Sequence, residues 1–184
     1  TDPEGVEYMD RDTRMYDHPA RTELGVEPVP FEQTIRDTLQ WLVDAGRLEA
    51  TSDYQCLAEA DITLICVPTP FDDMKTPDLQ YIVSAAEGIM PRLRAGKMVI
   101  LQSTTYPGTT RDVVQPILAA GGLKVGKDYY LGFSPEREDP GNAKFSAESI
   151  PKVVGGIDPE SGRLAALLYS QAIVRVVPVS NCEI

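Results

Sequence analysis

Short strand-like runs alternate with amphipathic stretches along this chain, and that alternation restricts its fold more than any other feature. Residues 62–67, 98–102 and 128–133 have the length and apolar or aromatic content of strands. Between them, apolar side chains recur at helical spacing over residues 79–93 and 113–118. Strands and helices that alternate in this way form right-handed β-α-β units. The sequence therefore predicts an α/β fold with a parallel, doubly wound sheet.

Several local signals refine this pattern. Residues 62–67, closed by two prolines, predict a strand that is buried on both faces. Residues 31–45 predict a helix that ends at Gly46, and Pro116 should kink its helix or mark a short first segment. Residues 1–30 are polar and irregular. The remaining predicted elements are a short strand at 152–156, a helix at 159–172 and a final strand at 173–179.

The charge balance excludes some classes of partner. The 184 residues carry 17 basic and 28 acidic side chains, a net charge of −11, which opposes long-range attraction to nucleic acid or anionic membranes. No apolar run approaches the roughly 18 residues that a membrane span needs. An anionic ligand would therefore have to be held by a local arrangement of groups.

Cysteine and histidine usage argues against metal and disulfide chemistry. Cys56, Cys66 and Cys182 are odd in number and widely spaced, without a CxxC pair, which favours a reducing cytosol and no zinc site. His18 is the single histidine, so neither a multi-histidine metal site nor a Ser-His-Asp triad is supported. We predict a cytoplasmic protein without a bound metal.

Three loops that follow predicted strands are chemically unusual: "VPTPFDDMKTPD", "QSTTYPGTT" and "FSPEREDPGN". In a parallel sheet, ligands bind beyond the carboxyl ends of the strands, so these loops should converge on one crevice. Each loop also has a plain interpretation. Prolines and Asp form turns, hydroxyls cap helices, and a charged segment can be a solvated turn. Taken singly, none of the three decides between a structural and a functional role.

Their combined chemistry is more informative. The hydroxyls of Ser103, Thr104 and Thr105 come just before a helix N-terminus, which favours phosphates or other polar ligands. Glu136 offers a carboxylate suited to orienting water or taking a proton. Arg137 offers a rigid fork of donors for an anionic or hydroxyl-rich substrate.

Five motifs in order resemble one enzyme family, the nucleotide-sugar dehydrogenases. They are "ICVPTP" (65–70), "STTYPGTT" (103–110), "FSPEREDPGN" (133–142), "KVVGG" (152–156) and "VVPVS" (176–180). The SPER-x-DPGN form is similar to the branch that acts on UDP-N-acetyl-glucosamine or UDP-N-acetyl-mannosamine. The UDP-glucose branch usually has an NPEFL-like segment there. The resemblance extends from about Phe31 to the end of the chain.

The resemblance implies a Rossmann-like domain and an NAD-dependent oxidation of a UDP-N-acetyl-hexosamine C6 alcohol to the carboxylate, in the synthesis of polysaccharide precursors. It also implies a homo-oligomer for the full-length enzyme. By resemblance, Thr105 would help to hold a catalytic water, Glu136 would be the acid/base or water-orienting carboxylate, and Arg137 would contact the substrate. The residues that would lie along NAD are Val67, Pro68, Thr69, Ser103, Thr104 and Thr105.

The departures from the family also lead to expectations. The sequence has no GxGxxG turn for the pyrophosphate, and the family's nucleophilic cysteine and central helix would come after Ile184. We expect residues 1–184 to be a truncated NAD-binding domain, without the central helix and the UDP-binding domain, and inactive alone. None of the three cysteines resembles the nucleophile, and "GGLKVGKD" (121–128) is expected to be a loop and not a P-loop. The alternative is a non-catalytic module that binds a nucleotide or nucleotide-sugar.

Overall fold

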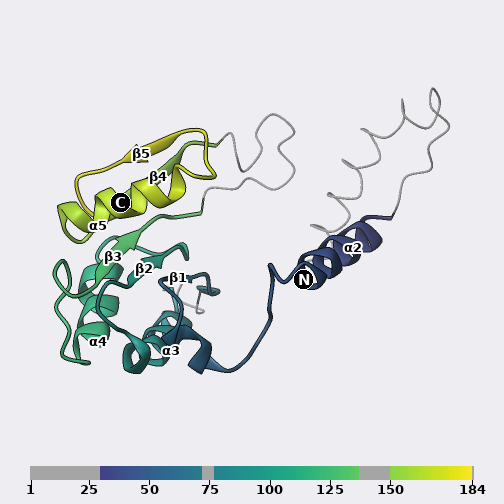
Figure 1. The fold of residues 1–184 in the computed structure, drawn as a ribbon. Coiled ribbons are helices and arrows are strands. Elements are labelled where there is room, and N and C mark those ends of the chain that lie inside the picture. Colours follow the sequence, from purple (N-terminus) through teal and green to yellow (C-terminus); the bar gives the residue numbers. More distant parts are fainter. Residues whose placement is uncertain (1–29, 72–76, 137–149, 184) are drawn as a thin grey trace. The chain divides into compact units, whose positions relative to one another are not determined.

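The computed structural model describes residues 30–71, 77–136 and 150–183 (Figure 1). The chain divides into two compact units, one formed by Thr1–Ser52 with Asp139–Lys144 and the other by Asp53–Glu138 with Phe145–Ile184. Among the described residues, no helix is both long and apolar enough to cross a membrane.

The described part of the first unit is the helix α2 (Phe31–Asp44) and the residues beside it. Gln33 and Gln40 each donate a side-chain hydrogen bond to a carboxylate four residues later, which supports the exposed face of the helix. The helix ends before Gly46, whose φ of +64° lies in the left-handed region that suits glycine. The predicted helix and its glycine stop are confirmed.

The second unit is built on a five-stranded sheet with the order β1-β2-β3-β4-β5. The β1, β2 and β3 strands are parallel, β4 runs antiparallel to β3, and β5 is parallel to β4. The sheet confirms the α/β, Rossmann-like fold class. The strands are β1 (Ile62–Ile65), β2 (Met98–Leu101), β3 (Tyr130–Phe133), β4 (Lys152–Gly156) and β5 (Val176–Pro178).

The direction of β4 differs from the all-parallel prediction. A parallel neighbour of β3 would need a crossover connection, usually through a helix. The sequence from 134 to 151 contains no apolar pattern of helical spacing that could supply one. Antiparallel pairing needs no such crossover, and it sets Gly132 opposite Gly156 and Phe133 opposite Gly155.

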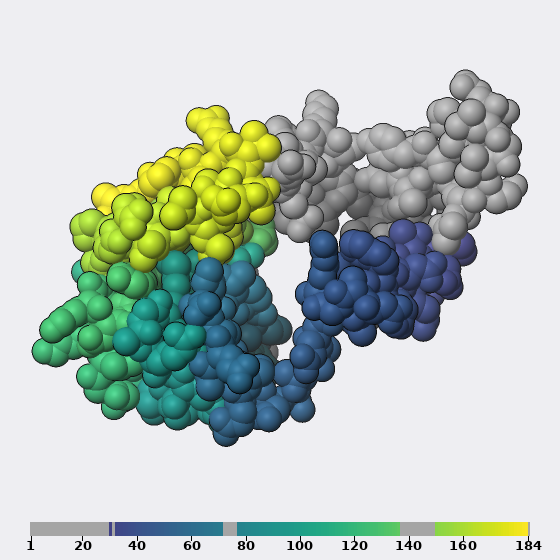
Figure 2. Space-filling view, in the orientation of Figure 1, coloured from purple at the N-terminus to yellow at the C-terminus, as the bar shows by residue number. Residues whose placement is uncertain are grey.

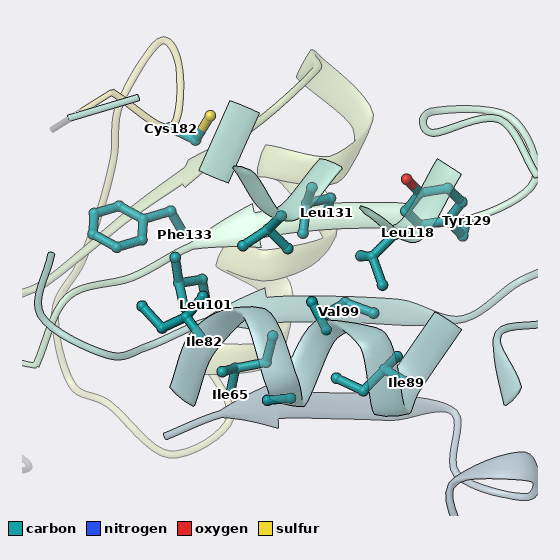
Figure 3. Packing of buried hydrophobic residues seen from close by; sticks show 13 residues of the cluster. Ile65, Ile82, Ile89, Val99, Leu101, Leu118, Tyr129, Leu131, Phe133 and Cys182 are labelled. Carbon is teal, nitrogen blue, oxygen red and sulfur yellow. The ribbon is translucent and has the colours of Figure 1, made fainter. Parts of the chain in front are cut away.

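One face of the sheet packs against the helices that follow β1 and β2 (Figure 3). Side chains of alternate strand residues, such as Val99, Leu101 and Leu131, form this core with Ile82 and Leu118. The elements over this face are α3 (Gln80–Ile89), the short 3-10 helix η2 (Met90–Arg92), the π-helical segment η3 (Thr109–Val114) and α4 (Gln115–Ala119). Pro116 lies in the first turn of α4, so it marks a segment boundary, as one of the two predicted alternatives requires.

The opposite face packs against α5 (Pro159–Tyr169), which Asp158 caps through the backbone N–H groups of Glu160 and Ser161. Met98, Ile100 and Val154 form the core there with Ala165 of α5. In Figure 2 the yellow-green atoms of the segment after residue 150 lie directly against teal and green atoms of residues earlier in the chain.

The β1 strand is the edge of the described sheet, and the prediction that it is buried on both faces is wrong. Ile62 and Leu64 are 43% and 45% exposed, whereas Ile65 on the other face is buried. An apolar run has the same appearance in an edge strand and in a central strand, so the sequence alone could not distinguish them. Beside β1, Arg94 bonds Asp61 and the carbonyl of Ala58, which fixes the 3-10 helix η1 (Tyr54–Ala58).

Candidate functional site

The candidate site lies where β1, β2 and β3 end. Their last residues, Ile65, Leu101 and Phe133, are paired in register, so the loops that follow leave the same edge of the sheet. Because β4 is antiparallel to β3, its first residue, Lys152, also lies at this edge. Four segments that are distant in sequence therefore meet there.

The loops after β1 and β2 are tied together by hydroxyl groups. The Ser103 side chain is buried, accepts a hydrogen bond from the Val67 N–H at 2.8 Å and donates to the Val67 carbonyl at 2.8 Å. The Thr69 hydroxyl donates to the carbonyl of Thr104 at 2.7 Å. These bonds confirm that the two loops converge, and they show that the Ser103 hydroxyl acts between the loops.

Thr105 begins a second set of hydroxyl contacts. The Thr109 hydroxyl donates to the carbonyl of Tyr106 at 3.0 Å, and the Thr105 and Thr109 hydroxyl oxygens are 2.8 Å apart. Since the one Thr109 proton points to Tyr106, Thr105 is the donor of that pair and its own oxygen can still accept. Gly108, with φ of +97°, makes the turn into η3. Thr105 is half-buried and suited to accept a hydrogen bond from water or an alcohol.

Glu136 is the centre of a third group. Its Oε2 atom accepts from Nζ of Lys152 at 2.9 Å and from Nε2 of Gln102 at 2.9 Å. The hydroxyl of Tyr169, on α5, donates to Oε1 of Gln102 at 2.7 Å. The Lys152 ammonium lies 5.4 Å from the centroid of the Tyr169 ring, within the range of a cation–π contact.

The sheet explains why these side chains meet. Continued by three residues, the β3–β4 register places position 136 opposite position 152. Strand side chains alternate between faces, so Gln102 follows Met98 and Ile100 on the face that α5 covers. The network therefore follows from strand direction and side-chain alternation.

Burial controls the ionisation of the neighbouring groups. It raises the pKa of Tyr169 to about 12, so the hydroxyl that donates to Gln102 keeps its proton at neutral pH. Burial also raises the pKa of the Cys66 thiol, an effect that Lys152 opposes and Glu136 reinforces. Cys66 is thus a protonated thiol at neutral pH, consistent with the prediction that it is not an activated nucleophile.

Cys66 and Cys182 lie in different environments. Cys66 was expected inside a buried strand, but it follows the end of β1 and keeps an exposed surface, although its thiol is partly buried. Cys182 is buried in the apolar core, and burial raises the pKa of its thiol despite the Arg111 side chain nearby. Cys182 therefore packs as an apolar residue of the core.

The prediction missed three members of the site, Gln102, Lys152 and Tyr169. A lysine that opens the otherwise apolar run "KVVGG" was a usable signal, because a charged side chain in such a run needs a partner. Arg137 lies outside the described residues. Within the described ranges, no group of three or more His, Cys, Asp or Glu side chains is placed to hold a metal ion.

Comparisons with known proteins agree with this geometry. Residues 20–173 match the family model described as "UDP-glucose/GDP-mannose dehydrogenase family, NAD binding domain". The chain is 39% identical over 144 residues to a UDP-N-acetyl-D-glucosamine 6-dehydrogenase of Pseudomonas aeruginosa, a match that covers 78% of this chain and 34% of that protein. It is 31% identical over 164 residues to a UDP-N-acetyl-D-mannosamine dehydrogenase of Methanocaldococcus jannaschii, covering 86% and 36%.

Among solved structures, an NDP-N-acetyl-D-galactosaminuronic acid dehydrogenase from Methanosarcina mazei Go1 aligns with a TM-score of 0.71 and 34% identity, covering 76% of this chain and 30% of that one. The chain thus spans about a third of the length of the relatives that it matches. A family match over most of the chain, on a sheet of the expected kind, leads to one conclusion: this chain belongs to the UDP-glucose/GDP-mannose dehydrogenase family, within its NAD-binding domain.

Proposed function

We propose that this chain forms part of an enzyme that uses NAD to oxidise the C6 alcohol of a UDP-N-acetyl-hexosamine to a carboxylate. The main support for this proposal is the position of Glu136. Its carboxylate is held by Lys152 and Gln102 at the ends of the strands, where ligands bind to sheets of NAD-binding domains. The printed activities of the glucosamine and mannosamine relatives support this substrate class.

The residues at the strand ends are compatible with a bound dinucleotide. Pro68 and Thr104 are exposed and Thr69 is half-buried, so the joined loops present a small-residue surface at the edge where such ligands bind. We propose that NAD would lie along Val67, Pro68, Thr69, Ser103, Thr104 and Thr105. Ser103 would act there through its backbone and through the shape of the loop, since its hydroxyl joins the two loops.

NAD, when bound, would supply a hydride acceptor, and conversion of the C6 alcohol to a carboxylate, which releases two electron pairs, would use two NAD molecules in succession. Water supplies the second carboxylate oxygen, so a group must orient it and take its proton. We assign this role to Glu136, with Thr105 accepting a hydrogen bond from the same water. Arg137 would contact the sugar or its phosphates, as the resemblance implies.

We further propose a reducing cytosolic location and a homo-oligomer for the complete protein. The cysteines of the described residues are free, as expected for a reducing compartment. Sedimentation of the complete protein tests the assembly, and a monomer at micromolar concentration would exclude it.

The Glu136→Gln variant of the complete protein tests the catalytic role. Its amide keeps the size of the side chain but cannot take a proton, so acid formation should slow by about 10²-fold or more. Turnover of the UDP-N-acetyl-hexosamine is followed through NADH absorbance. Unchanged turnover would remove Glu136 from the mechanism.

The Thr105→Ala variant, with Thr110→Ala as a buried-threonine control, tests the water site. Thr105→Ala should lower kcat more than it raises KM, because a water held for reaction stabilises the transition state and not the bound sugar. Equal changes in both constants would make Thr105 a plain binding residue.

Calorimetric titration of the 184-residue chain with NAD tests the alternative function. Saturable NAD binding would favour a binding module, whereas no binding would indicate a fragment that needs the rest of the protein.

A further inference from the structure

The Lys152 side chain is only 8% exposed, an uncommon position for a lysine. A buried ammonium is costly unless it is paired and hydrogen-bonded. Lys152 meets both conditions through Oε2 of Glu136 at 2.9 Å and the ring of Tyr169 at 5.4 Å. The contact is asymmetric, because the Glu136 side chain is 47% exposed. A buried, fixed cation therefore meets a carboxylate whose side chain is about half exposed.

We propose that Lys152 is the positioning residue of Glu136, holding one carboxylate oxygen at the strand edge and keeping the group ionised. The inference rests on the proposed function, because it assigns Lys152 to act through the carboxylate that takes the proton. It names a residue outside the set predicted from sequence, and it gives the lysine of "KVVGG" a role in the reaction rather than in packing.

Gln102 and Tyr169 make the arrangement directional. The Tyr169 hydroxyl donates to Oε1 of Gln102, so the amide must present its Nε2 donors toward Glu136. The same Tyr169 ring lies beside the Lys152 ammonium. One α5 side chain therefore fixes both donors that converge on Oε2, and a small movement of α5 would move both together.

Among the described residues, the ionisable groups around Glu136 come from three parts of the fold. Lys152 is on β4, Tyr169 is on α5, and the Cys66 thiol follows β1. Tyr169 and Cys66 are neutral at pH 7, because burial raises the pKa of each. Among these described neighbours, Lys152 is the group that brings positive charge to the carboxylate.

Lys97 provides a matched comparison. It is also a buried lysine, directly before β2, but it lies at the end of the strands opposite the candidate site. Its ammonium donates to the carbonyl of Leu57. Removal of Lys97 should disturb packing near η1 without changing the environment of Glu136. The Lys97→Met variant therefore reports the general effect of deleting a buried lysine.

The first experiment is an NMR titration of the Glu136 side-chain carboxyl in the 184-residue chain and three variants. Lys152→Met should raise the pKa of Glu136 by about one unit or more, because an opposite charge within hydrogen-bond distance favours the ionised form. Lys152→Arg keeps a positive charge, so the Glu136 pKa should stay close to its wild-type value. Lys97→Met should leave the Glu136 pKa within about 0.3 unit of the wild-type value. A Glu136 pKa that is equal in the wild type and Lys152→Met overturns the proposal.

If Lys152→Met fails to fold, Lys152→Gln, which removes the charge but keeps a hydrogen-bond donor, replaces it in the titration with the same expected rise of the Glu136 pKa. Tyr169→Phe tests the second donor. It retains the ring beside Lys152 and removes the hydroxyl that orients Gln102, so it should raise the Glu136 pKa in the same direction by a smaller amount. No shift in this variant would contradict the role of the second donor.

Kinetics of the complete enzyme then distinguish a positioning role of Lys152 from a merely structural one. Lys152→Met should lower kcat about tenfold, move the acidic limb of the kcat profile to higher pH, and change KM by less than about threefold. A kcat loss without movement of the limb would indicate a merely structural lysine. If the titration moves as expected but Glu136→Gln is fully active, the positioning contact stands and the proposed catalytic role of Glu136 fails. If the complete wild-type protein does not oxidise a UDP-N-acetyl-hexosamine with NAD, the proposed function itself fails.

Discussion

At the scale of single residues, burial decides what each ionisable side chain does. Tyr129 is fully buried, and no group among the described residues is placed to bond its hydroxyl. Burial raises its pKa to about 12. Tyr169 has a similar pKa but bonds Gln102, so its hydroxyl takes part in the site. Two tyrosines with similar acidity therefore serve core packing and side-chain orientation respectively.

The Tyr129→Phe variant should be more stable than the wild type at high pH. Between about pH 10 and 12 the unfolded tyrosine loses its proton while the folded one keeps it, so the wild type loses stability as pH rises. The advantage of the variant should grow by about 1.4 kcal/mol by pH 11, one unit above the ordinary tyrosine pKa. Urea unfolding at pH 7 and pH 11 measures it, and an advantage that is equal at both values would contradict the assignment.

At the scale of elements, the close approach of β4 and α5 depends on glycine. A Cβ atom on Gly156 would lie 2.1 Å from the backbone nitrogen of Gly162, and one on Gly155 would lie 2.0 Å from the carbonyl of Asn181. The obstructing atoms belong to the backbone and cannot rotate away. The two glycines of "KVVGG" therefore allow a helix and the C-terminal segment to lie directly on the strand.

Gly156→Ala should lower the free energy of unfolding by about 3 kcal/mol, because α5 must move to admit the methyl group. Gly162→Ala is the matched control from the other side of the contact. Its Cβ would be 3.3 Å from the Gly156 nitrogen, and alanine favours the helix, so its effect should stay within about 1 kcal/mol. Urea denaturation of both variants measures the difference, and equal losses would rule out this explanation.

The spacing of apolar residues along the sequence predicted the helices and strands. Their neighbours in the fold decided the direction of β4 and the exposure of β1. Three parallel strands and α5 followed from apolar runs and helical spacing, which are properties of neighbouring residues. The direction of β4 and the exposure of β1 did not, because an apolar run does not specify its neighbours. Gln102 and Tyr169 are 67 residues apart, and nothing local links them. The acid Glu136 was predicted, whereas the donors that hold it were not.

At the scale of the whole molecule, the second unit has an exposed edge. Ile62 and Leu64 of the outer strand β1 and Leu167 of α5 are 43–53% exposed, and Ile62 and Leu167 line the same surface depression. Such edges can pair with other chains unless charge keeps them apart. The net charge of −11 provides that repulsion at neutral pH, and it vanishes near the pI of about 4.5.

We therefore expect the chain to self-associate as pH falls toward 4.5, and Leu64→Lys to reduce the association because the charge lies on the edge strand. Val174→Lys is the control, since Val174 is 78% exposed and lies away from β1 in sequence and in the sheet order. Light scattering from pH 7 to pH 4.5 compares the two at equal net charge. Equal suppression by both would show that net charge, and not the β1 edge, governs association.

The antiparallel β4 strand has a consequence for variation in the family. The pairing register of β3 and β4 places Lys152 opposite Glu136. The contact between the two side chains therefore does not depend on the length of the segment that connects them. Insertions or deletions between the two residues would change the connecting segment while the ion pair is retained. A slip of one residue in the ladder would instead turn Lys152 to the other face. Sheet pairing thus separates the part of the site that can diversify from the part that cannot.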